Sequence, residues 1–119
     1  AELLTRSDVV SLHVPLTPQT QNLIDAAALA TMKSDAILIN AARGGVVDEL
    51  ALAEALRAGK LGGAALDVFD REPVDAAYGQ RFVGVPNLLL TPHIAGVTVE
   101  SNVRVSDVTA RRVAERLAG

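Results

Sequence analysis

Four charged or titratable side chains stand where apolar segments of the sequence end. Arg43 follows AILINAA, Asp67 closes GGAALD, Glu72 lies a little beyond it, and His93 follows NLLLTP. A guanidinium can hold a carboxylate through paired hydrogen bonds, and an imidazole exchanges protons near neutral pH. This set of residues is therefore suited to binding a small acid and moving one of its protons.

Arginine, histidine and glutamate together fit the interconversion of a 2-hydroxy acid and a 2-keto acid. The arginine would hold the carboxylate beside the reacting carbon, and the histidine would take or give the hydroxyl proton. The glutamate would pair with the imidazolium and fix its orientation. Because no side chain of this set transfers a hydride, the reaction would need a nicotinamide cofactor.

Each residue also has a structural interpretation when taken alone. Arg43 in a glycine-flanked turn is more often solvated than catalytic, and Glu72 is more often a surface acid. His93 alone is evenly balanced between a loop role and a site, whereas Asp67 needs a partner or a ligand if it is buried. His13 is expected to be structural or to face the rim of a cofactor site. Three further charges are expected to be solvated in a loop: Asp70, Arg71 and Asp75.

The segments around these residues alternate between strand and helix patterns. Strands are predicted at 7–15, 35–41, 62–69 and 87–92, and helices at 26–33, at 49–59 and from about 98 onward. Asp25 and Asp48 have the type and place of helix N-caps, and Gly59 those of a C-terminal stop. Residues 70–86 are predicted to be a loop. The apolar centre of the second strand is expected when both faces of a sheet are covered.

This alternation predicts an α/β fold with a Rossmann-like, doubly wound parallel sheet. Ligands of such sheets bind outside the carboxyl ends of the strands. Arg43 and His93 follow predicted strands there, Asp67 lies at the end of one, and Glu72 is close behind. The fold therefore predicts one site at one edge of the sheet.

Composition limits the classes of function. The 119 residues suffice for one small domain, and the net charge of −3 offers no basic face for nucleic acid. The chain has no cysteine, which excludes disulfides and thiolate metal sites, and no metal site is predicted. No apolar stretch is long enough to span a bilayer, so a cytoplasmic protein without a membrane partner is expected.

Three ordered motifs, NAARGGVVDE, ALDVFDREP and LLLTPHIAG, resemble those of the D-isomer-specific 2-hydroxyacid dehydrogenases. That family includes phosphoglycerate, glycerate, formate and D-lactate dehydrogenases, and the resemblance extends over essentially the whole chain. It implies that Arg43 binds and polarises the substrate and that His93, supported by Glu72, is the general acid and base. It also implies that Asp67 bonds the nicotinamide carboxamide. The further cofactor contacts implied by the resemblance are Val14, Ala41, Ala42, Arg43, His93, Ala95 and Gly96.

One family motif is absent, because the sequence contains no G-x-G-x-x-G phosphate-binding loop. Residues 1–119 are therefore expected to be the C-terminal half of an NAD-binding domain, ending in a long helix and lacking the substrate domain. A lone 119-residue chain is expected to bind NAD weakly and to be inactive. NAD is expected because it is the commoner cofactor in the family. NADP stays open, because the acidic residue that contacts the cofactor ribose in the family is absent too.

The resemblance implies an NAD(P)-dependent oxidoreductase for a small D-2-hydroxy acid, and a homodimer. The stretch AGVTVESNVRVSD resembles members that act on acidic hydroxy acids such as sulfolactate or malate. Two other classes remain open. One is a non-catalytic NAD(H)-sensing protein of the same fold, which only turnover separates from an enzyme. The other is a flavodoxin-like binding module, which would carry its own phosphate-binding first turn.

Overall fold

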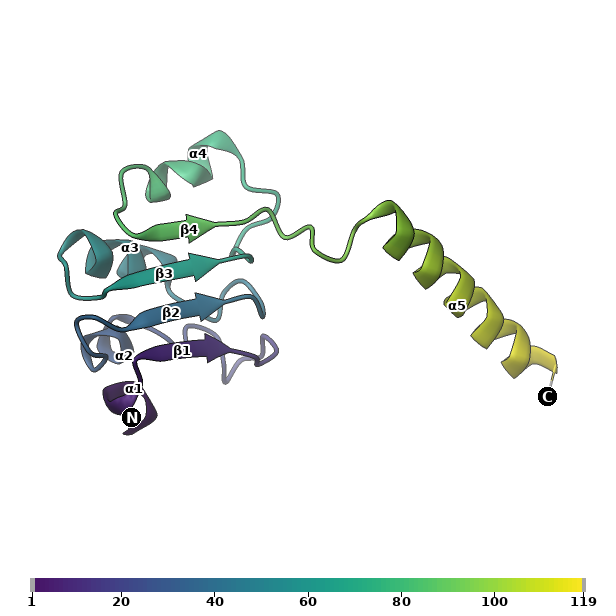
Figure 1. Ribbon diagram of the computed structural model, residues 1–119, viewed down its shortest axis with the longest axis horizontal. Coiled ribbons are helices and arrows are strands. Elements are labelled where there is room, and N and C mark those ends of the chain that lie inside the picture. Colours follow the sequence, from purple (N-terminus) through teal and green to yellow (C-terminus); the bar gives the residue numbers. More distant parts are fainter. Residues whose placement is uncertain (1, 119) are drawn as a thin grey trace.

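Four parallel strands form the sheet of the computed structural model, which describes residues 2–118 (Figure 1). They lie side by side in sequence order: β1 Val9–Leu12, β2 Ile37–Asn40, β3 Gly63–Leu66 and β4 Leu88–Leu90. The helical segments are α1 Glu2–Arg6, α2 Ala26–Ala30, α3 Glu49–Arg57, α4 Ala76–Gly79, η1 Gln80–Phe82 and α5 Val99–Ala118. Because all the strands run the same way, their carboxyl ends share one edge of the sheet. The predicted α/β alternation is confirmed, with shorter strands than expected.

Local capping sets the ends of α2 and α3. The Asp25 side chain accepts a hydrogen bond from the Ala28 amide at 2.8 Å, and Asp48 caps α3 through two amides. Gly59 ends α3 in the left-handed region at φ +64°, where a side chain would be strained. These three predictions are confirmed. Helix α2 stops at Ala30, earlier than predicted, because the Thr31 hydroxyl and amide both bond back onto the last turn.

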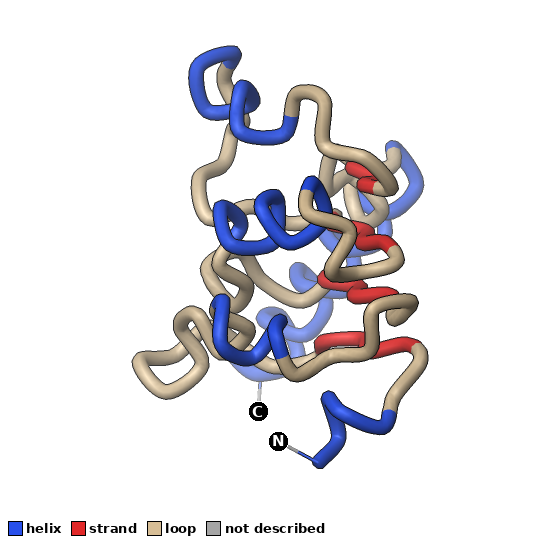
Figure 2. Tube along the Cα trace, turned by 90° about the vertical axis from the view of Figure 1, so that its left-hand side faces the viewer, coloured by secondary structure: helices blue, strands red, loops and turns tan. Residues whose placement is uncertain are grey.

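The helices α2 and α3 lie on one face of the sheet and share its hydrophobic core (Figure 2). Residues that are paired across neighbouring strands point to the same face of the sheet. The side chains that face the helices therefore form rows across the strands. The buried members of this core include Val10, Leu38, Ala64, Leu29, Leu52 and Leu56. Burying one such leucine stabilises the fold by roughly 1.5–3 kcal/mol. This packing fixes the strand ends on which the candidate residues stand.

The opposite face of the sheet is open, which corrects the expectation that both faces are covered. Val9, Ile37 and Leu89 point to that side and are 55%, 42% and 62% exposed. The apolar sequence of β2 therefore does not mean that helices of residues 2–118 cover both faces of the sheet.

A second correction concerns residues 70–86, which were expected to be a plain loop. They contain α4 and η1, and Asp75 caps α4 by accepting a bond from the Tyr78 amide at 2.7 Å. The rings of Tyr78 and Phe82 are buried and meet edge to face, with centroids 6.3 Å apart. Asp75 also pairs with Arg71 at 2.8 Å, and both side chains stay exposed, as expected.

The long predicted helix is α5, and it extends away from the sheet (Figure 1). None of its residues is buried, and its apolar residues are largely exposed, among them Val99, Val103 and Leu117. Among residues 2–118, no helix combines the length and the apolar character that crossing a membrane requires.

Candidate active site

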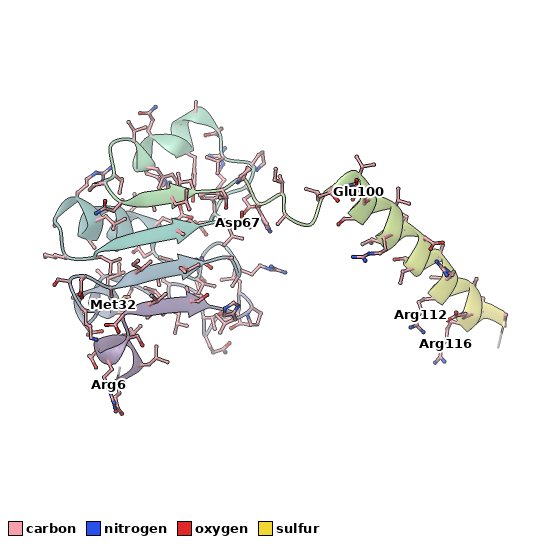
Figure 3. All side chains as sticks on the ribbon, viewed as in Figure 1. Arg6, Met32, Asp67, Glu100, Arg112 and Arg116 are labelled. Carbon is pink, nitrogen blue, oxygen red and sulfur yellow. The ribbon has the colours of Figure 1, made fainter. Side chains whose placement is uncertain are left out.

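The residues expected to do chemistry follow the strand ends at one edge of the sheet. Asp67 comes directly after β3, and its place at that edge is visible in Figure 3. Its amide donates to the Asn40 carbonyl of β2 at 2.9 Å, and the Thr91 amide donates to the Leu66 carbonyl at 3.0 Å. The parallel bonding thus continues just beyond the named strands. This holds the first residues of both loops in fixed places.

Asp67 holds the backbone of His93. Its Oδ1 accepts a bond from the His93 amide at 3.1 Å and another from the Thr91 hydroxyl. His93 follows Pro92 and has φ +52°, a left-handed conformation that few non-glycine residues adopt. Such strain persists where the surroundings enforce it, often at functional sites. The carboxylate expected to need a partner therefore has one, in the loop that carries the histidine.

The side chains of His93 and Glu72 form a direct pair. His93 Nδ1 lies 2.9 Å from Glu72 Oε2 and 3.1 Å from Oε1, and Oε1 also accepts from the Phe69 amide at 2.9 Å. The bond with His93, followed by that from the Phe69 amide, holds the pKa of Glu72 below its ordinary value. A carboxylate at Nδ1 favours the imidazole proton on that nitrogen, which leaves Nε2 to exchange a proton with a ligand.

Asn40 fixes the turn that carries Arg43. It is 2% exposed, its Nδ2 donates to the Arg43 carbonyl at 3.0 Å, and its Oδ1 accepts from the Ala42 amide at 3.1 Å. The guanidinium of Arg43 is exposed and donates to the Ala42 carbonyl at 2.6 Å. The turn is therefore rigid, while the charged end of its arginine faces solvent.

The glycines after Arg43 allow two loops to pack closely. A Cβ added to Gly44 would lie 1.8 Å from the carbonyl oxygen of Phe69, closer than any real contact. The Gly44 backbone therefore lies against the start of the loop that contains Glu72. Glycine permits such a close approach, and the group that approaches is the chain's own backbone.

The candidate residues line two separate cavities. One of about 320 Å³ brings together the predicted cofactor contacts Val14, Ala41, Ala42 and Arg43, with His13 beside them. A larger one of about 730 Å³ is lined by His93 and Glu72 and by apolar residues that include Phe69, Phe82 and Leu90. Arg43 and His93 thus follow the same sheet edge without sharing a cavity.

Three further residues complete the description of the predicted site. Ala95 and Gly96 are exposed, between β4 and α5, and line neither cavity. His13 is exposed and its Nε2 lies 2.9 Å from the Ser11 hydroxyl. Within residues 2–118, no cluster of three potential ligands could hold a metal ion.

Several residues that hold the site were not singled out in the sequence. They are Asn40, Glu49, Tyr78 and Thr91. Asn40 had a readable signal, a polar residue closing an apolar strand. Glu49 had none, because an acid in the first turn of a helix is ordinary there and its burial, at 5% exposure, depends on distant residues.

Comparison with known proteins identifies the family. Residues 1–95 match the D-isomer specific 2-hydroxyacid dehydrogenase, NAD binding domain. The chain is 56% identical to the (S)-sulfolactate dehydrogenase of Chromohalobacter salexigens, over 98% of this chain and 37% of that protein. It is 53% identical to the D-3-phosphoglycerate dehydrogenase of Haemophilus influenzae, over 87% of this chain and 26% of that protein.

A solved structure shows the same fold. The D-lactate dehydrogenase of Aquifex aeolicus, complexed with NAD and lactic acid, superposes with a TM-score of 0.83 and 37% identity. The match covers 99% of this chain and 39% of that one. The chain therefore belongs to the D-isomer specific 2-hydroxyacid dehydrogenase family, within its NAD-binding domain. It spans 37% of the length of the first of these curated relatives and 26% of the second.

Proposed function

We propose that the protein carrying this chain is an NAD-dependent dehydrogenase that interconverts a small D-2-hydroxy acid and its 2-keto acid. The observation that supports this most directly is the His93–Glu72 pair, with the carboxylate on Nδ1 and Nε2 left for a ligand. A histidine arranged in this way acts as a general acid when charged and as a general base when neutral. Family membership supports the same reaction.

The proton is the part of the reaction that this chain's residues handle. In reduction, the His93 imidazolium gives its Nε2 proton to the keto oxygen, and in oxidation the neutral ring takes the hydroxyl proton. The ionised Glu72 stabilises the imidazolium through Nδ1 and keeps the ring in place. NAD, when bound, accepts or supplies the hydride.

Arg43 is the residue that we propose to bind the substrate carboxylate. Its guanidinium contacts only the neighbouring Ala42 carbonyl among the hydrogen bonds of residues 2–118, so its remaining donors are available. Two parallel bonds to a carboxylate would hold the substrate at the sheet edge that Arg43 shares with His93, and the substrate would have to extend from the cavity of the arginine to that of the histidine. The buried Asn40 keeps the arginine backbone fixed while the side chain turns to the substrate.

The residues at the sheet edge fit a nicotinamide cofactor. The bonds given to the Asp67 side chain within residues 2–118 both go to Oδ1, so Oδ2 is the oxygen suited to accept from a carboxamide. The small side chains of Val14, Ala41 and Ala42 line a shallow cavity that suits a flat ligand. We propose these as cofactor contacts, with His93, Ala95 and Gly96 from the loop after β4.

We propose that residues 1–119 supply the second half of the cofactor domain and that the phosphate-binding loop belongs to another part of a longer protein. A homodimer and a cytoplasmic location remain predictions. Of the three proteins compared above, the sulfolactate dehydrogenase has the highest sequence identity to this chain. Sulfopyruvate is therefore the first 2-keto acid to test.

The proposal is tested by NADH oxidation in the full-length protein against a panel of 2-keto acids. The panel contains sulfopyruvate, oxaloacetate, hydroxypyruvate, phosphohydroxypyruvate, glyoxylate and pyruvate, each repeated with NADPH. Turnover of one or two of them with NADH is the expected result. Tight NADH binding without turnover of any would favour the alternative, an NAD(H)-sensing protein that uses the same fold.

A further inference from the structure

A buried carboxylate on α3 lies beneath the loop that carries Glu72. Glu49 is only 5% exposed and accepts three bonds. Its Oε1 accepts a hydrogen bond from the Asp70 amide at 2.7 Å. Its Oε2 accepts one from the Tyr78 hydroxyl at 2.6 Å and one from an Arg81 guanidinium nitrogen at 3.4 Å. A buried carboxylate is stable only with such partners. Glu49 therefore ties the loop to the helix.

Tyr78 holds the residue of the loop that follows the one held by Glu49. Its hydroxyl accepts from the Arg71 amide at 3.3 Å while donating to Glu49. The Arg81 guanidinium lies 3.6 Å from the centre of the Tyr78 ring. Burial, followed by the bond to Glu49, raises the pKa of Tyr78 to about 12, so its hydroxyl stays a donor at neutral pH.

Three consecutive amides of the loop are thus held by three side chains. The Phe69 amide goes to Glu72, the Asp70 amide to Glu49 and the Arg71 amide to Tyr78. The turn they define ends at Glu72, whose Oε1 is shared between the Phe69 amide and His93. A shift of the Asp70 backbone would therefore move the carboxylate that orients the histidine.

We propose that Glu49 is a positioning residue, which acts through the Phe69–Glu72 turn to aim the Glu72 carboxylate at Nδ1 of His93. Tyr78 assists it by holding the next amide. The consequence for catalysis rests on the proposed function, whereas the consequence for the histidine ring does not. No contact between Glu49 and substrate or cofactor is involved.

Glu49→Gln changes this anchor with little change of volume. A carboxylate accepts bonds on both oxygens, whereas a glutamine amide offers one acceptor oxygen and turns an NH₂ toward the second donor. Either the Asp70 amide or the Tyr78 hydroxyl then loses its partner, which is costly in a buried place. Tyr78→Phe is the milder variant, since it keeps the packed ring and removes only the hydroxyl.

The test combines NMR and kinetics on the full-length protein with ¹⁵N-labelled histidine, His93 being assigned through a His93→Gln sample. At a pH where the ring is neutral, the wild type is expected to show mainly the Nδ1–H tautomer. Glu49→Gln should raise the Nε2–H fraction, lower kcat on the order of tenfold to a hundredfold, and leave KM for NADH unchanged. Tyr78→Phe should change the Nε2–H fraction and kcat in the same directions, but by less. Glu54→Gln, on the exposed side of α3, should change neither the tautomer nor kcat.

A folded Glu49→Gln protein with the wild-type tautomer and kcat would overturn the proposal. If Glu49→Gln does not fold, Tyr78→Phe decides: an unchanged tautomer overturns the positioning role, and a shifted one supports it. If the wild type turns over no 2-keto acid but Glu49→Gln still shifts the tautomer, the proposed function fails while the positioning role stands.

Discussion

At the scale of single residues, the site depends on carboxylates that each hold a neighbouring group. Asp67 fixes the backbone of His93, Glu72 fixes its ring, and Glu49 fixes the turn that carries Glu72. The sequence had already placed Asp67, Glu72 and His93 at one edge of the sheet. It had not placed Glu49 there, because the contact of Glu49 with the Asp70 amide joins residues 21 positions apart, which no local pattern reveals.

Glu72→Gln should lower stability at neutral pH and not in acid. The pKa of Glu72 is lowered in the folded state, so its ionised form contributes stability above its ordinary pKa, and this is lost as pH falls through the folded value. The pair is more than a third exposed, which limits the contribution to about 0–1 kcal/mol. Urea unfolding at neutral pH and near pH 3 (~1 unit below an ordinary glutamate pKa) measures it. An equal difference at both would contradict the assignment.

Arg43→Ala should reduce use of the substrate more than binding of NADH. Loss of a charge-assisted bidentate contact costs roughly 1.5–3 kcal/mol, which is about a tenfold to hundredfold fall in kcat/KM. Arg43→Lys keeps the charge without the paired geometry and should recover only part of the loss. The measurement is steady-state kinetics with the best 2-keto acid. Full recovery by lysine would show that charge alone matters.

At the scale of elements, the sequence predicts those features whose causes are local. The caps Asp25 and Asp48 and the stop at Gly59 act within one turn of their helices, and all three were readable. Helix α4 could not be predicted from the sequence, because four residues show too little periodicity. Its stability comes from the buried rings of Tyr78 and Phe82. The open face of the sheet was missed for a similar reason, since an apolar strand looks the same whether or not a helix covers it.

Gly44→Ala should destabilise the fold by about 1–3 kcal/mol, because its methyl group would overlap the Phe69 carbonyl and push apart the turns of Arg43 and Glu72. Gly96→Ala is the matched control, since no atom lies within 4 Å of the added Cβ and its φ is ordinary. Thermal unfolding of both variants measures the difference. Equal melting temperatures would mean that the two turns do not need their close contact.

At the scale of the whole molecule, the sheet edge brings the candidate residues together and leaves apolar surface on the open face and on α5. The parallel direction of the strands followed from the alternation in the sequence, whereas their order is known only from the structure. The division of the site into two cavities did not, because it depends on how the loops pack against one another.

The lone 119-residue chain should bind NAD weakly, because its sequence has no G-x-G-x-x-G loop to hold the pyrophosphate. Isothermal calorimetry of the chain with NAD is expected to show no binding at micromolar ligand. Micromolar affinity would mean that the contacts around Asp67 and Val14 suffice without that loop.

The account rests most heavily on His93 as the acid and base, and one measurement tests this directly. In the full-length protein, kcat for NADH-dependent reduction of the best 2-keto acid is compared between the wild type and His93→Gln. Loss of a general acid is expected to lower kcat by roughly 10²–10⁴-fold. NADH affinity, measured by fluorescence titration, should fall only slightly, because His93 is one of several proposed cofactor contacts and the others are kept. A His93→Gln enzyme with near wild-type kcat would contradict the account.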